Sequence, residues 1–211
     1  MNTRLLVIVA LLPTVGCVAE TLDSTPTPSS LVDAPNLDDG VPDPVDAYLT
    51  EFDRALLEQV GMELHRGDDP PLIEGTFFLD SLLVAWDDDG HDGWNVVHTW
   101  VEFSQQREDA SLSCATWDDG ESNSQGMGGY VSGTGDCFSA YIEQEYYSVG
   151  DDCTVQMPMV WSGCLADGDV EDLAMGFIAV ERSGDCHDTV REGHRRMVVE
   201  DDGLAERVNA S

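Results

Sequence analysis

The chain has 211 residues, of which 42 are acidic and nine are basic, and its formal net charge at neutral pH is -33. A surface with that charge repels nucleic-acid phosphates and anionic lipid headgroups, which excludes a nucleic-acid-binding protein and a basic membrane-binding face. A partner attracted by charge is therefore a cation or a cationic surface. The same acidity also serves solubility in a salty environment, and the sequence leaves that alternative open.

The N-terminus has the three parts of an export signal. Arg4 supplies the positive end, residues 5–12 form an apolar run, and small residues lead to a cysteine. The run is too short to cross a bilayer as a helix, which takes roughly 20 apolar residues. The ending Thr14-Val15-Gly16-Cys17 resembles the lipobox of bacterial lipoproteins, although leucine is usual where Thr14 stands. The resemblance implies that residues 1–16 are a signal peptide and that Cys17 is acylated and anchors the chain to a membrane. An ordinary secretory signal is the alternative.

Residues 17–43 are predicted to be a disordered acidic tether that follows the lipidated cysteine. Prolines, serines and aspartates are frequent there, and few large apolar side chains are available to form a core. A proline-rich, charged segment stays extended and holds a folded domain away from the headgroups. Val18 follows the cysteine, whereas aspartate at that position is typical of lipoproteins kept in the inner membrane. By that resemblance we expect the outer membrane.

Residues 44–211 are the right length for one domain. Pro44 follows an aspartate, as at a capped helix start, and apolar residues then recur at steps of three and four as far as Leu64. This spacing predicts one amphipathic helix over 44–65, with a buried stripe and a charged outer face. Gly67 and the following prolines end it.

From residue 72 onwards the pattern changes to short β-rich runs separated by Gly, Asp and Ser clusters. In residues 97–104 apolar side chains alternate with polar or aromatic ones, which is typical of a strand with one buried face. The sequence predicts a mainly-β domain, an antiparallel β-barrel or a β-sandwich, with the N-terminal helix packed across one end or face. The predicted strands are 73–85, 95–105, 110–117, 128–146 with a break near 133–135, 153–163, 172–182 and 194–200.

Five cysteines follow Cys17 in a chain predicted to enter an oxidising compartment, so disulfides are expected. A hairpin loop at 118–128 would place Cys114 opposite Cys137, and a loop at 165–171 would place Cys153 near Cys186. The predicted disulfides are therefore Cys114–Cys137 and Cys153–Cys186, and Cys164 is predicted to be unpaired. Metal binding by these cysteines is disfavoured because the sequence has no Cys-x-x-Cys motif.

The segment 87–95 has aspartates at near-alternate positions in a glycine-bearing loop. Calcium takes six to eight oxygen ligands, and Asp87, Asp89 and Asp92 could supply part of such a set. The pattern departs from the helix-loop-helix calcium site, because the twelfth position from Asp87 is His98 instead of glutamate. A solvated acidic turn is the alternative to a calcium site.

Catalytic motifs are missing from the sequence. It contains no Gly-x-Ser-x-Gly, no His-Glu-x-x-His and no phosphate-binding loop, so a secreted hydrolase is only the third hypothesis. His98 could lie in a pocket but is interpreted as a structural residue. The tryptophans could line a ligand cavity, but we expect them in the core.

The stretch from Pro70 to Phe77 resembles the start of a group of uncharacterised envelope lipoproteins, in which a proline pair and Glu-Gly-Thr-aromatic precede an antiparallel fold. Gly75-Thr76-Phe77 is also weakly similar to the first strand of lipocalin-like barrels, where a glycine bends the chain and an aromatic residue closes the base. Both resemblances imply a non-enzymatic binding or structural module. The working hypothesis is a lipid-anchored domain that binds a small apolar ligand or another envelope protein. A calcium-stabilised adhesion or interaction module is the alternative.

Overall fold

The computed structural model describes residues 40–96, 98–118, 123–148, 152–186 and 191–208. These belong to one folded unit, Asp38–Ser211. The predicted signal peptide, Cys17 and nearly all of the predicted tether lie outside the described residues. Two short helical elements come first, the 3-10 helix η1 (Asp43–Ala47) and the α-helix α1 (Glu51–Gln59), and strands follow. Among the described residues no helix has the length and apolarity needed to span a membrane.

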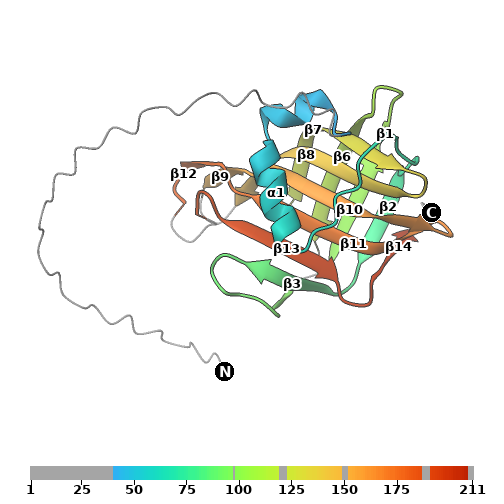
Figure 1. Cartoon of the computed structure of the whole chain (residues 1–211). Helices are drawn as coiled ribbons and strands as arrows, with labels where there is room; N and C mark the ends of the chain where they lie inside the picture. Colours follow the sequence, from blue (N-terminus) through green and yellow to red (C-terminus); the bar gives the residue numbers. More distant parts are fainter. Residues whose placement is uncertain (1–39, 97, 119–122, 149–151, 187–190, 209–211) are drawn as a thin grey trace, which may run out of the picture. The chain divides into compact units, whose positions relative to one another are not determined.

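Eight antiparallel strands close into a barrel (Figure 1). The first and last of them pair with each other, so that the ring has no free edge along this path. The structure thus confirms the mainly-β class and decides between the two predicted architectures in favour of the barrel. In ring order the strands are β2 (Gly75–Leu79), β5 (Thr99–Ser104), β6 (Ser111–Asp118), β7 (Asn123–Thr134), β8 (Cys137–Ser148), β10 (Met159–Ala166), β11 (Asp169–Ile178) and β14 (Leu204–Val208).

Six further strands extend the barrel wall. One group continues from the far half of β8, and another continues from the far half of β11. The first group is β9 (Cys153–Gln156) and β12 (Glu181–Gly184), the second is β13 (Arg195–Glu200), β3 (Leu82–Asp87) and β4 (Asn95–Val96), and β1 (Asp68–Asp69) pairs in parallel with the end of β7.

Several predicted strands are divided in the structure. The predicted strand 73–85 turns at residues 80–81, so that β2 stays in the barrel and β3 leaves it. The predicted strand 153–163 breaks at Met157-Pro158 between β9 and β10. Pro158 lacks the backbone donor that a continuous ladder requires, which accounts for this break. The last barrel strand, β14, was not among the predicted strands.

The predicted single helix over 44–65 is wrong in its extent. The Thr50 hydroxyl accepts a hydrogen bond from the Asp53 amide (3.3 Å), and the Asp53 carboxylate accepts one from the Thr50 amide (3.0 Å). This capping box starts a new helix at residue 51 and separates it from η1. The helix ends before Gly61, whose φ of +102° suits glycine. Phe52, which the periodicity placed on the buried stripe, is 70% exposed.

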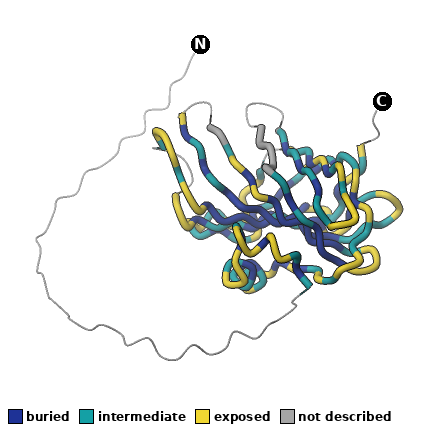
Figure 2. Tube along the Cα trace, turned by 90° about the horizontal axis from the view of Figure 1, so that it is seen from above, coloured by how far each residue is buried: buried dark blue, intermediate teal, exposed yellow. Residues whose placement is uncertain are grey.

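Side chains fill the barrel interior. The buried residues follow the middle of the strands in Figure 2. Four fully buried aromatic residues occupy its centre, and their rings lie 6.0–6.5 Å apart at angles from 53° to 81°. Such tilted and edge-to-face contacts are the favourable geometries for aromatic pairs. These four residues are Phe77, Phe103, Phe138 and Trp161.

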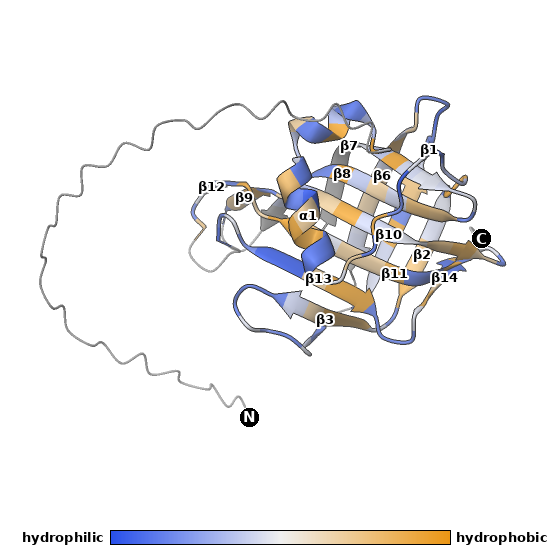
Figure 3. Cartoon of the chain, in the orientation of Figure 1, coloured by the Kyte–Doolittle hydropathy of each residue, from blue (hydrophilic) through white to orange (hydrophobic). Residues whose placement is uncertain are grey.

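A second core lies between the outer wall of the barrel and the N-terminal helices. Val45, Leu49 and Leu57 form one buried cluster with Tyr141 and Val160, and α1 lies over the strands in Figure 3. A Cβ atom at position 176 of β11 would lie 2.9 Å from the Leu57 side chain, so glycine there lets α1 approach closely. The helix therefore covers a face of the barrel, one of the two positions that the sequence left open.

Candidate functional site

The aspartate-rich turn after β3 is organised around Asp87, whose side chain is fully buried. One oxygen of its carboxylate accepts hydrogen bonds from the Asp89 amide (2.8 Å) and from His91 Nδ1 (3.0 Å). The other accepts a bond of 2.6 Å from Arg196 Nε on β13. Burial alone would raise the pKa of Asp87, but these bonds and the charges of Arg196 and His194 lower that pKa to about 2. The carboxylate is therefore ionised at neutral pH.

His194 is a member of this cluster that sequence reasoning did not identify. Its side chain is 3% exposed, and its two ring nitrogens lie 3.1 Å from Asp87 Oδ2 and 3.0 Å from Asp89 Oδ2. Neither contact has the angles of a hydrogen bond. These three residues form a group that could hold a metal ion, whereas Asp92 is exposed and lies outside it. An imidazole with two carboxylates suits zinc better than calcium, which prefers oxygen ligands.

Arginines already neutralise the turn. Arg195 Nη2 lies 2.8 Å from Asp88 Oδ1, and Arg191 Nη2 lies 3.0 Å from Asp89 Oδ1. With Arg196 on Asp87, three guanidinium groups match three carboxylates. Binding a divalent ion would add two positive charges to a balanced network. The local arrangement therefore favours an ion-pair cluster that fixes the β3 end to β13, and calcium at this turn remains an untested prediction.

The disulfides are Cys137–Cys164 and Cys153–Cys186, and Cys114 is buried with a free thiol. The predicted pair Cys114–Cys137 and the predicted free Cys164 are wrong, whereas the second pair is the one named from the sequence. On β6 and β7, Leu112 is opposite Gly129 and Ala115 is opposite Gln125, so Cys114 lies between these two pairs and is far from Cys137 in the register. Cys137 instead begins β8, where β10 places Cys164 directly opposite it.

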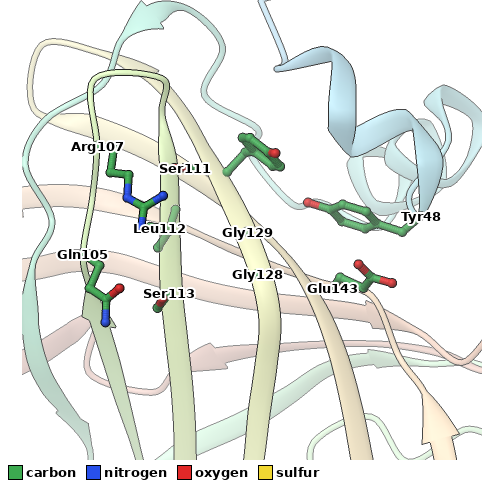
Figure 4. A pocket seen from close by; sticks show the side chains of 10 residues that line it. Tyr48, Gln105, Arg107, Ser111, Leu112, Ser113, Gly128, Gly129 and Glu143 are labelled. Atoms are coloured by element: carbon green, nitrogen blue, oxygen red, sulfur yellow. The ribbon is translucent and has the colours of Figure 1, made fainter.

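A pocket of about 320 Å³ lies on the outer wall beside η1 (Figure 4). Tyr48 and Glu143 stand at one side of it, and Arg107 with two serines lines the other. Tyr48 donates a hydrogen bond from its hydroxyl to the Tyr141 carbonyl (2.9 Å), and burial raises its pKa. This lining is too polar and charged to suit a small apolar ligand.

The tryptophans do not gather in the core as expected. Trp161 is the buried one, Trp94 is 62% exposed, and the others are half-buried. Trp100 on β5 is the cross-strand partner of both Phe78 on β2 and Trp117 on β6. Their ring centroids lie 4.9 Å and 6.4 Å apart, and the two indole planes differ by 3°. We call Phe78, Trp100 and Trp117 the aromatic ladder.

The aromatic ladder is on the outer wall, because the neighbouring Phe77 and Val101 face the filled interior. His98 is next to it, with its ring 6.0 Å from that of Phe78 and its Nδ1 2.8 Å from the Asp80 carbonyl. The next cross-strand pair on the same outer face of β2 and β5 is Thr76 and Glu102.

An open hollow of about 470 Å³ includes this pair in its lining, together with Glu74. Arg207 also lines the hollow, but it donates hydrogen bonds to the carbonyls of Glu74 and Gly168. The aromatic ladder thus lies one outward-facing cross-strand pair away from a hollow that Glu74 and Glu102 line.

Comparison with protein-family models, with curated proteins and with solved structures finds no match to this chain.

Proposed function

We propose that this chain is a lipid-anchored protein of the outer membrane and acts as a non-enzymatic interaction module, with the aromatic ladder as its contact surface. The anchor rests on the export signal and on Cys17. Two disulfides are consistent with an oxidising compartment outside the cytoplasm.

The observation that carries the proposal is the aromatic ladder. Three large rings on adjacent strands form a continuous apolar strip on a wall whose other outward side chains are mostly polar. Tryptophan is enriched at binding hot spots because it buries a large area with little loss of conformational freedom. The closed barrel holds the rings in fixed positions, so binding would need little reordering.

The negative charge of the chain favours a cationic partner. Five of the eight arginines after residue 17 already pair with carboxylates of the same chain. Most of the 42 acidic residues consequently have no cation of this chain to neutralise them. An arginine or lysine of a partner can stack on the Trp100 ring and form an ion pair with the Glu102 carboxylate, because aromatic rings and carboxylates both attract a cation. We therefore propose an envelope protein with a basic face as the partner.

A carrier of small apolar ligands is the weaker proposal. The four central aromatic rings occupy the barrel, and the two pockets described above are open and polar. A contact on the outer wall needs no rearrangement of this core.

Affinity capture from detergent-solubilised envelopes tests the proposed surface. We expect the immobilised protein to retain a basic envelope protein that elutes as salt is raised. Trp100→Ala and Glu102→Gln should each reduce the retained amount by about tenfold, which corresponds to roughly 1.4 kcal/mol. Trp94→Ala is the matched control, because Trp94 is exposed elsewhere on the surface. Equal capture by all variants would reject the aromatic ladder as the contact surface.

The anchor has a separate test. Cells fed an alkyne-tagged fatty acid should label the wild-type protein, and Cys17→Ser should abolish the label and release the protein from the membrane fraction. Unchanged fractionation of Cys17→Ser would refute the lipid anchor without bearing on the aromatic ladder.

A further inference from the structure

The Cys137–Cys164 disulfide lies on the outer wall of the barrel, near the turn that joins β7 to β8. The two residues are directly opposite each other on β8 and β10, and both are half-exposed. In the other disulfide, Cys153 is fully buried and only Cys186 is half-exposed. A dissolved thiol can therefore approach both sulfurs of the first bond but only one sulfur of the second.

The chain segment 61–67, here called the strap, runs over β10, β8 and β7 between α1 and β1. A row of buried serines in cross-strand register holds it. The Ser162 hydroxyl donates to the Glu63 carbonyl, the His65 amide donates to Ser139 Oγ (2.8 Å), and Ser132 Oγ donates to the His65 carbonyl (2.6 Å). Both backbone polar groups of His65 are thus fixed to the barrel.

This fixation places the His65 imidazole beside the disulfide. Its Nε2 lies 4.0 Å from Cys164 Sγ, within reach of a weak hydrogen bond to sulfur. On the other side of the ring, Nδ1 lies 4.0 Å from the Glu63 carboxylate. The side chain of His65 is only 18% exposed. The His65 imidazole therefore lies between the Glu63 carboxylate and the Cys164 sulfur, where it can carry a proton.

We propose that Cys137–Cys164 is a thiol-exchange site, opened by an external thiol reductant, in which His65 stabilises the departing sulfur. The thiolate of the reductant attacks Cys137 Sγ, a new sulfur–sulfur bond forms there, and the Cys137–Cys164 bond breaks. Cys164 leaves as a thiolate and takes the proton of the His65 imidazolium. A second reductant thiol then attacks the mixed disulfide and releases Cys137 as a thiol. Two external thiols are oxidised to one disulfide, and the protein bond gains two electrons.

The neighbour of each sulfur determines which one leaves and which one is attacked. A thiolate leaves faster when a neighbouring cation lowers its proton affinity, and imidazolium is a common source of that effect in reactive cysteines. Cys164 is the sulfur beside His65, so Cys137 is the sulfur expected to carry the mixed disulfide. The site is independent of the aromatic ladder, and its failure would leave the proposed function unaffected.

Differential alkylation of the mature protein in detergent micelles tests the proposal. After timed exposure to reduced glutathione and an acid quench, peptic peptides report the opening of each disulfide. We expect Cys137–Cys164 to open about tenfold faster than Cys153–Cys186, with glutathione found on Cys137. His65→Ala should slow the opening of the first bond by about three- to tenfold and leave the second unchanged. His98→Ala, which changes an exposed histidine on another part of the barrel, should change neither.

The sign of the His65→Ala effect separates chemistry from packing. If His65 only helped to cover the bond, its removal would expose the sulfurs and accelerate opening. Unchanged or faster opening in His65→Ala, equal opening of the two disulfides, or glutathione on Cys164 would each overturn the proposal.

Discussion

The guanidinium carbon of Arg207, on the last barrel strand, lies 4.8 Å from the ring centroid of Phe77, on the first barrel strand. Arg207 also donates hydrogen bonds of 2.6 Å to the Glu74 and Gly168 carbonyls. A Cβ atom at position 75 would lie 2.2 Å from Arg207 Nη1, and the φ of Gly75 is +150°. One side chain therefore closes this end of the barrel, and the glycine before Phe77 makes room for it.

Removing Arg207 should destabilise the barrel at its closure. Arg207→Ala loses a cation–π contact and two charge-assisted hydrogen bonds, together about 2 kcal/mol. We expect Tm to fall by roughly 4–8 °C in a thermal melt followed by circular dichroism. Arg107→Ala, in the polar pocket, is the matched control and should shift Tm little. Equal losses in the two variants would contradict the role given to Arg207.

Asp87 should make the fold sensitive to acid. Its folded pKa, about 2, lies below the unfolded value near 3.9, so its contribution is complete above pH 4 and disappears as pH falls towards 2. Asp87→Asn should therefore cost about 2 kcal/mol of unfolding free energy at pH 7 and almost nothing near pH 2. Urea titrations at both pH values measure the difference. Asp92→Asn, at an exposed position, should behave as wild type; a pH-independent cost for Asp87→Asn would point to packing instead of charge.

Glu200 is expected to make stability depend on pH in the opposite direction to Asp87. Burial, followed by the nearby carboxylates of Asp80 and Asp202, raises its pKa to about 7. A carboxyl group with a raised folded pKa stabilises the fold below its unfolded pKa of about 4.3, and this stabilisation is lost as pH rises through 7. Glu200→Gln should thus stabilise the protein by about 1–3 kcal/mol at pH 8 and progressively less towards pH 4. Glu206→Gln, on an exposed side chain, is the control. A gain that is the same at pH 4 and pH 8 would refute this explanation.

Cys114 should be chemically protected in the folded protein. Burial raises the pKa of its thiol, and the thiolate is the reactive form. In a Cys17→Ser protein we expect iodoacetamide to label Cys114 on the order of 100-fold more slowly in buffer than in urea. Mass spectrometry of the labelled peptide follows both rates. Fast labelling without denaturant would mean that the barrel opens near β6.

Calcium should have little effect on stability. Arg191, Arg195 and Arg196 already neutralise the aspartates of the turn, so an added ion must compete with three guanidinium groups. We expect Tm to change by less than about 1 °C between a chelator and millimolar calcium. A calcium-dependent rise in Tm that Asp89→Asn abolishes would instead support the calcium site predicted from the sequence.

Part of the barrel could be predicted because local sequence patterns indicate many of its strands and their inner faces. Alternation in residues 97–104 places Val101 and Phe103 on the inner face, and the same alternation places Trp100 on the outer one. The signal for the aromatic ladder was therefore present, but the general expectation that tryptophan is buried prevailed over it. The helix was overextended because Thr50 and Asp53 were not recognised as a capping box inside an apolar periodicity.

Long-range pairings had no local signal. His194 reaches Asp87 only because β13 pairs with β3, at a sequence separation of 107 as in the Asp88–Arg195 contact. Cys164 lies opposite Cys137 because β10 pairs with β8, which is not its neighbour in the sequence, and hairpin spacing cannot reveal such a pairing. The spacing argument gave the correct pair for Cys153 and Cys186, where β9 pairs with the edge strand β12.

Site-specific photo-crosslinking in living cells tests the central claim most directly. A photoreactive phenylalanine analogue is placed at position 100 in the aromatic ladder, and at position 94 as the matched exposed tryptophan site. The proposed function predicts a discrete adduct at position 100 with a basic envelope protein, weakened by Glu102→Gln and absent at position 94. No adduct at position 100, or the same adducts at both positions, would contradict an interaction surface on the aromatic ladder.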